Sequence, residues 1–129
     1  MSNVKKRILV VDDEQDVGQS IKIVLNEYGI DVDFFAHPLQ ALKNFKPDFY
    51  DLVILDIKMP KINGFELYDR SRSIDKNIKA LFLTALGDVE AYGTHSSKVY
   101  PLTGERHFAK KPITNSELLN QIYSIIPIA

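Results

Sequence analysis

The stretch Ile8-Leu9-Val10-Val11-Asp12-Asp13-Glu14 decides the fold, because a short apolar run ends abruptly in acidic residues. Two later runs, residues 52–55 and 80–83, have the same apolar character. A strand with one wet face would alternate apolar and polar residues, whereas a continuous apolar run indicates burial on both faces. These runs therefore predict a parallel sheet that is covered by helices on both sides.

Strand and helix signals alternate along the chain, which is typical of right-handed βαβ units in an open, doubly wound α/β sheet. Five strands in this pattern favour the flavodoxin-like strand order 2-1-3-4-5. We expect one domain over residues 1–129. The expected strands are residues 7–11, 32–35, 52–55, 80–83 and, more weakly, 106–109; the expected helices are 15–28, 38–45, 64–72 and one opened by Thr114.

The helix ends carry local signals. Gly29 closes the first helix, and Pro38 suits the first turn of the second. Thr114 with Glu117 three residues later predicts a capping box for the last helix. Residues 87–104 contain glycine, serine and proline and little apolar periodicity, so the helix expected there is poorly defined.

Composition excludes several classes of protein. The 129 residues are 45% hydrophobic and 26% charged, as in a globular domain, and no apolar run approaches the roughly 20 residues that span a bilayer. Without cysteine there is no disulfide or thiolate metal site. A net charge of -1 gives no argument for binding nucleic acid or membrane. We therefore expect a cytoplasmic protein.

Polar residues follow four of the expected strands directly. Asp12 and Asp13 follow the first strand, Asp56 the third, Thr84 the fourth, and Lys110-Lys111-Pro112 the fifth. Ligands of open parallel sheets bind at the carboxyl ends of the strands, so these residues are expected to converge at one edge. Crowded carboxylates must take up protons or a cation, and oxygen ligands alone suit Mg²⁺.

This group of residues has the chemistry of a phosphoryl site. A carboxylate such as Asp56 can act as the nucleophile of phosphoryl transfer. Lys111 would supply positive charge to the transferred group, with the hydroxyl of Thr84 and the backbone N–H of Ala85 beside it. Each residue alone has a simpler interpretation: Asp12 or Asp13 could cap the helix that begins near Gln15, and the others could be ordinary residues at strand ends.

The ordered set of motifs resembles the receiver domain of response regulators over nearly the whole chain. It comprises Val10-Val11-Asp12-Asp13-Glu14, Asp56-Ile57-Lys58-Met59-Pro60 with Gly64, Leu83-Thr84-Ala85 and Lys111-Pro112. The resemblance implies the flavodoxin-like fold and a signalling domain that is not an enzyme, except that it catalyses its own phosphorylation and dephosphorylation. It also implies a Mg²⁺ cofactor.

The resemblance implies a role for each matching residue. Asp56 would be the phosphoacceptor, Asp13 a direct Mg²⁺ ligand and Asp12 a ligand acting mainly through water. The backbone carbonyl of Lys58 would be the third protein ligand. Thr84 would be the switch hydroxyl, with Ala85 beside it.

Three further roles concern the fifth strand and its end. Lys111 would pair with the phosphoryl group, and the peptide bond to Pro112 would be cis, as is usual in the family. Phe108 would be the switching aromatic residue, although ordinary packing in the fifth strand remains an alternative.

The resemblance also implies partners: a histidine kinase or phosphotransfer protein as phosphoryl donor, and a downstream effector or a homodimer. The last two would use the face made by the fourth helix, fifth strand and last helix. One departure affects this face, because Thr84 and Lys111 are farther apart than is usual and the extra length lies in residues 87–104.

Competing functions lack their key residues. A haloacid-dehalogenase-type phosphatase needs a second Asp where Lys58 stands, and the acidic residues after the first strand would repel the phosphate of FMN. No P-loop motif is present. The serious alternative is a pseudo-receiver that is not phosphorylated and acts as a protein-interaction module, although such proteins usually lose a key residue and none is lost here.

Overall fold

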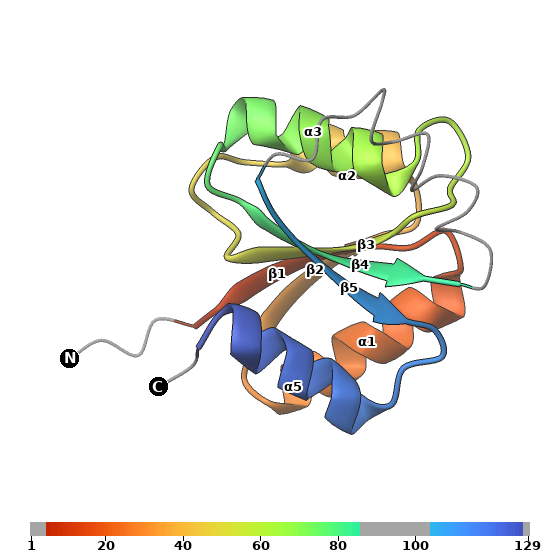
Figure 1. Ribbon diagram of the computed structural model, residues 1–129, viewed down its shortest axis with the longest axis vertical. Coiled ribbons are helices and arrows are strands. Elements are labelled where there is room, and N and C mark those ends of the chain that lie inside the picture. The colour runs from red at the N-terminus through yellow and green to blue at the C-terminus, as the bar shows by residue number, and fades with distance from the viewer. Residues whose placement is uncertain (1–4, 86–103, 128–129) are drawn as a thin grey trace.

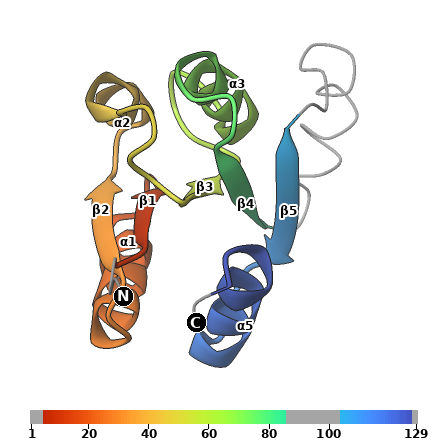
Figure 2. The same ribbon diagram turned by 90° about the vertical axis from the view of Figure 1, so that its left-hand side faces the viewer.

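The protein forms a five-stranded parallel sheet in the order β2-β1-β3-β4-β5, which confirms the predicted flavodoxin-like topology. The structure is a computed structural model that describes residues 5–85 and 104–127. The strands are β1 (Arg7–Val11), β2 (Asp31–Phe35), β3 (Leu52–Asp56), β4 (Lys79–Thr84) and β5 (Glu105–Lys110). The sheet and its order can be followed in Figure 2.

Helices cover both faces of the sheet (Figure 1). On one face lie α1 (Gln15–Glu27) and α5 (Asn115–Ile125), and on the other lie α2 (Pro38–Asn44) and α3 (Gly64–Ile74). The strand residues alternate between the two resulting cores. Leu9, Val53 and Phe82 belong to the core beneath α2 and α3, whereas Ile8, Ile54 and Leu81 belong to the core beneath α1 and α5. This two-sided burial is the reason why β1, β3 and β4 carry continuous apolar runs.

The helix signals in the sequence are borne out. Gly29 follows α1 with a φ of 79°, a conformation that glycine adopts without strain. Pro38 occupies the start of α2. In the capping box of α5, the backbone N–H of Glu117 donates to Thr114 Oγ1 over 3.1 Å, and the N–H of Thr114 donates to Glu117 Oε1 over 2.9 Å.

The element ends differ slightly from those predicted. The strands β2 to β5 each extend farther, and α3 continues to Ile74. The first helix ends at Glu27, and its N-cap residue is Glu14, which makes no side-chain capping bond. The simpler interpretation of Asp12 or Asp13 as the cap of this helix is therefore wrong.

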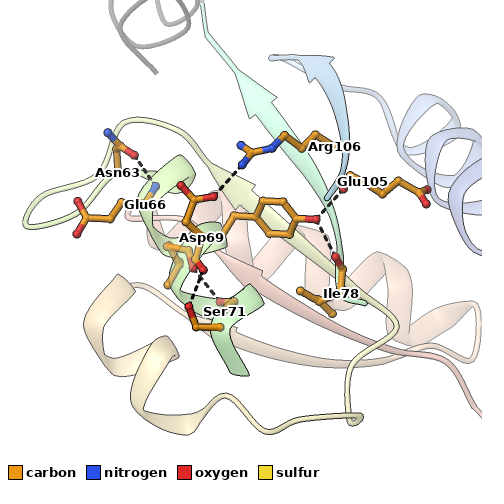
Figure 3. Close-up of polar contacts among 10 residues, drawn as sticks. Asn63, Glu66, Asp69, Ser71, Ile78, Glu105 and Arg106 are labelled. Carbon is orange, nitrogen blue, oxygen red and sulfur yellow. Dashed lines mark hydrogen bonds and ion pairs between the residues drawn. The ribbon is translucent and has the colours of Figure 1, made fainter. Parts of the chain in front are cut away.

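The start of α3 lies against the end of β3. Asn63 caps the helix by accepting a hydrogen bond from the N–H of Glu66 over 2.9 Å (Figure 3). The N–H of Gly64 donates to the carbonyl of Ile57 over 2.8 Å. A Cβ atom at Gly64 would lie only 2.3 Å from the carbonyl oxygen of Asp56. Glycine is thus required here by close approach, which fixes the start of α3 against the residue expected to accept the phosphoryl group.

The predictions for the long segment between β4 and β5 fall mostly on residues 86–103, which lie outside the described residues. This applies to the fourth helix and to its share of the expected output face. Within residues 5–85 and 104–127, no helix has the length and apolar character that a membrane span requires.

Candidate functional site

Three carboxyl groups meet at the carboxyl ends of β1 and β3. These strands are neighbours, with Val11 paired to Leu55, so the residues that follow in each strand lie side by side. Oxygen atoms of Asp12, Asp13 and Asp56 lie within 4.8 Å of one another. Asp12 is 1% exposed and Asp56 is 5% exposed, whereas Asp13 faces solvent. The topology thus forms an acidic pocket in which Asp12 and Asp56 are buried and Asp13 is open to solvent.

Lys111 brings a positive charge to this pocket from the chain that follows β5. Its Nζ lies 3.0 Å from Asp12 Oδ2, 3.2 Å from Asp56 Oδ1 and 3.6 Å from Glu14 Oε1. The backbone N–H of Lys111 donates to the carbonyl of Thr84 over 2.7 Å, which fixes the chain at the end of β4. The peptide bond between Lys111 and Pro112 is cis.

Thr84 and Ala85 complete the edge at the end of β4. Thr84 is buried, and its hydroxyl lies 3.4 Å from the carbonyl oxygen of Ala109. A cavity of about 500 Å³ opens above the acidic pocket. It is lined by Asp13, Glu14, Asp56, Lys58, Met59, Pro60, Ala85 and Lys111. A ligand that enters this cavity therefore meets carboxylates and an ammonium group together.

Phe108 lies outside the pocket, on β5. Its side chain is 46% exposed, and its ring stacks on Phe82 with centroids 5.2 Å apart and an interplanar angle of 25°. A second contact joins it to Phe65, at 6.3 Å between centroids. The ring thus packs at the surface of the core beneath α3 and is not part of the lining of the cavity above Asp56.

Burial raises the pKa of two carboxyl groups in the pocket, Asp12 and Asp56. Burial and the charge of Asp12 raise the pKa of Asp56 to about 7, although Lys111 opposes the shift. Burial also raises the pKa of Asp12, opposed by the N–H of Glu14 and by Lys111. Burial alone would lower the pKa of Lys111, but Asp12 and Asp56 outweigh it and raise that pKa. The pocket therefore holds more negative charge than one lysine neutralises.

This pocket fits a hard divalent cation. Its donors are carboxylate oxygens close enough to share one ion, and the raised pKa values of Asp12 and Asp56 reflect a site that lacks sufficient positive charge. Sequence reasoning did not identify Glu14 as a contact of Lys111, nor Met59 and Pro60 as part of the cavity wall. The sequence did carry a signal for them, since Glu14 directly follows Asp13, and Met59 and Pro60 directly follow Lys58.

Residues 8–123 match the family model described as "Response regulator receiver domain". The chain is 32% identical over 125 residues to sporulation initiation phosphotransferase F of Bacillus subtilis, with 97% of each chain covered. It is 33% identical over 120 residues to the transcriptional regulatory protein CusR of Escherichia coli, with 93% of this chain and 51% of the relative covered. The chain thus spans nearly all of the first relative and about half of the second.

Solved structures show the same likeness. The response regulator protein TrrA of Thermotoga maritima, solved in complex with Mg(2+)-BeF, is 35% identical with a TM-score of 0.73, covering 94% of this chain and 99% of that one. A response regulator receiver domain from Clostridium thermocellum is 28% identical with a TM-score of 0.78, covering 94% of both chains.

Proposed function

This chain belongs to the response regulator receiver family of two-component signalling, and we propose that it accepts a phosphoryl group on Asp56 in a Mg²⁺-dependent reaction. Receiver domains are signalling domains rather than classical enzymes. The observation that carries the proposal is the placement of the Asp56 carboxylate, 3.2 Å from Lys111 and within the acidic pocket. The cavity lining thus includes a carboxylate that could act as nucleophile, carboxylate oxygens that could hold a cation, and an ammonium group that could pair with phosphate, which supports the proposal.

The reaction follows from the residues of the pocket. A carboxylate oxygen of Asp56 forms a bond to phosphorus while the bond between phosphorus and the donor nitrogen of a phosphohistidine breaks, and the imidazole leaves with the electron pair. Lys111 pairs with the phosphoryl oxygens, and the hydroxyl of Thr84 turns from Ala109 to donate to them. The backbone N–H of Ala85 is a further donor.

Asp12, Asp13, Asp56 and the backbone carbonyl of Lys58 would hold Mg²⁺. The cation would neutralise the carboxylates and the developing charge on the phosphoryl oxygens. Without that neutralisation an anionic phosphoryl donor would be repelled by the pocket, so the proposed reaction depends on the metal.

The donor would be a histidine kinase or a phosphotransfer protein. Output would pass to an effector or to a second copy of the chain through the surface that includes β5 and α5. Phe108 belongs to this surface, and its inward turn would follow the movement of Thr84. The part of the surface expected from a fourth helix lies in residues 86–103.

Mg²⁺ is expected to bind weakly, since a site of few carboxylates leaves several water molecules on the ion. The Asp13→Asn variant should lose at least about tenfold in affinity, as for other metal sites that lose a partner. Isothermal titration calorimetry would measure both proteins. Asp16→Asn is the matched control, because Asp16 lies in the first turn of α1 and outside the acidic pocket. Equal affinity in wild type and Asp13→Asn would refute the role of Asp13.

Phosphoryl transfer is tested by incubating the chain with Mg²⁺ and a small phosphoryl donor or a cognate histidine kinase. We expect one modified residue, Asp56, located by mass spectrometry of peptides, and a linkage that hydroxylamine cleaves, as for acyl phosphates. The Thr84→Ala variant should still be labelled, since its hydroxyl contacts the phosphoryl group and does not accept it. A label on another residue would contradict the proposal, and no label at all would favour an interaction module that is not phosphorylated.

A further inference from the structure

Helix α3 connects the backbone of the proposed acceptor to the start of β5. Its first residue, Gly64, lies against the carbonyl oxygens of Asp56 and Ile57. About one turn farther along, Asp69 Oδ1 accepts a hydrogen bond from Arg106 Nη2 over 2.8 Å (Figure 3). One helix therefore contacts both the acceptor site and the strand that carries Phe108.

Tyr68 adds a second attachment beside this ion pair. Its hydroxyl lies 2.7 Å from the carbonyl oxygen of Ile78, just before β4, and 2.9 Å from that of Glu105 at the start of β5. Because a phenol has one proton, it donates to one of these carbonyls at a time. Both attachments meet β5 before Phe108, so α3 holds the first half of this strand.

Arg106 fills a buried position beside Phe82. Its side chain is only 5% exposed, and its Cζ lies 4.9 Å from the centroid of the Tyr68 ring and 5.8 Å from that of Phe82. A buried cation is unfavourable unless it is paired, and here the Asp69 carboxylate and the two ring faces compensate it. Loss of the ion pair with Asp69 would therefore leave the Arg106 guanidinium less firmly fixed in this position.

Phe108 packs against the same Phe82 ring from an exposed position. It stands two residues after Arg106, so both side chains project from the same face of β5. Arg106 takes the buried place beside Phe82, and Phe108, at 46% exposure, takes the outer one. Because the two side chains share the Phe82 ring in a close-packed interior, an inward turn of Phe108 that follows Thr84 would require the Arg106 side chain to adjust.

We propose that Asp69 and Arg106 are positioning residues that hold Phe108 outward and thereby oppose phosphoryl acceptance at Asp56. The inference rests on the proposed function and adds to it two residues that favour the outward arrangement of Phe108 before phosphorylation. If the phosphoryl group favours the inward arrangement, anything that favours the same arrangement must by linkage strengthen binding at Asp56. Breaking the Asp69–Arg106 ion pair should therefore tighten binding of a phosphoryl group.

The test is a titration of the Mg²⁺-saturated full chain with beryllofluoride as phosphoryl mimic, followed by NMR of the backbone amides of residues 105–110. Asp69→Asn and Arg106→Gln should each bind beryllofluoride about fivefold more tightly than the wild type, at the low end of typical coupling between sites. The double variant should bind no more tightly than either single variant, because all three remove the same interaction. Affinity for Mg²⁺ alone should stay unchanged.

The matched control is Arg70→Gln. It removes an arginine from the same helix and breaks the exposed ion pair with Glu66, and it should bind the mimic with wild-type affinity. Arg106→Lys keeps the charge without the planar fork and should lie between Arg106→Gln and the wild type. This variant also provides a folded protein should Arg106→Gln fail to fold.

The possible results distinguish an ion pair that affects binding at Asp56 from one that affects folding alone. Variants that lose stability in urea but keep or weaken their affinity for beryllofluoride would overturn the inference, since a purely structural ion pair affects folding alone. In that case binding by the wild type would leave the proposed function intact. A wild type that fails to bind beryllofluoride with Mg²⁺ would overturn the proposed function and the inference together.

Discussion

The Asp56→Asn variant is expected to lose phosphoryl acceptance completely and, without divalent cations at pH 8, to be more stable toward unfolding than the wild type. An amide is not a nucleophile for phosphoryl transfer at neutral pH, so labelling should disappear. The gain in stability has a separate cause. It arises because the substitution removes a buried negative charge that lies beside Asp12.

The direction of the pH dependence follows from the raised pKa of Asp56. This pKa is about 7 in the folded protein, against an ordinary value of 3.8. Between these pH values the folded chain keeps a proton that the unfolded chain has released. The stability contributed by the protonated carboxyl group is fully present below about pH 4 and is lost as pH rises through about 7. The asparagine variant has no such loss.

The size of the effect is bounded by the shift. Roughly three pKa units at about 1.4 kcal/mol each give an upper limit of about 4 kcal/mol. Because Lys111 and Asp12 readjust in the variant, we expect a gain of about 2 kcal/mol at pH 8 and a smaller gain of about 0.8 kcal/mol at pH 5. Urea denaturation of both proteins at both pH values, with a chelator present, measures this difference in the free energy of unfolding.

Glu27→Gln provides the control for the stability measurement, since it removes a carboxylate from an exposed position at the end of α1. Its stability should not change between pH 5 and pH 8 by more than about 0.5 kcal/mol relative to the wild type. Adding Mg²⁺ at pH 8 should stabilise the wild type more than Asp56→Asn. Equal stability of Asp56→Asn and wild type at both pH values would show that the Asp56 charge is not costly.

β1, β3 and β4 were predictable because burial on both faces leaves continuous apolar runs in the sequence. The strand order followed from the alternation of strands with helices. The ends of the strands were less predictable. β4 begins at Lys79, and β5 runs from Glu105 to Lys110. These three charged residues are of the kind expected in a loop, so the sequence alone did not assign them to strands. Backbone pairing continues to these residues while their side chains reach solvent, and a hydrophobic pattern does not register backbone hydrogen bonds.

The acidic pocket was predictable because each of its residues lies at or just after the carboxyl end of a strand. Parallel topology then places strand ends together, so Asp12 and Lys111 meet although 99 positions separate them. The Asp69–Arg106 ion pair had no such signal. An arginine in an edge strand normally reaches solvent, whereas the Arg106 side chain is only 5% exposed and packs against Tyr68 and Phe82.

Phe108 shows the same limit. Its place three residues before Lys111 allowed either ordinary packing or a switching role. The structure shows packing against Phe82 together with high exposure, which leaves the switching role a prediction. Which role prevails depends on the energies of two arrangements, and a sequence pattern specifies at most one of them.

The Gly64→Ala variant is expected to lose about 3 kcal/mol of folding stability and most of its rate of phosphoryl acceptance. The added methyl group would lie 2.3 Å from the carbonyl oxygen of Asp56 and 3.1 Å from the Cα of Ile57. These are backbone atoms, so no rotation of a side chain relieves the contact. Either α3 or the end of β3 must shift, and both movements displace the Asp56 carboxylate from Lys111.

Gly29→Ala separates this effect from the general consequences of replacing a glycine. Gly29 has a φ of 79° and no heavy atom near the position of an added Cβ, so its replacement carries only backbone strain of about 1 kcal/mol. Phosphoryl acceptance should stay at the wild-type rate, because Gly29 lies at the end of α1 and far along the chain from Asp56. Urea denaturation and the initial rate of labelling by a small phosphoryl donor measure both variants. If Gly64→Ala matched Gly29→Ala in both measurements, the start of α3 would not be what positions Asp56.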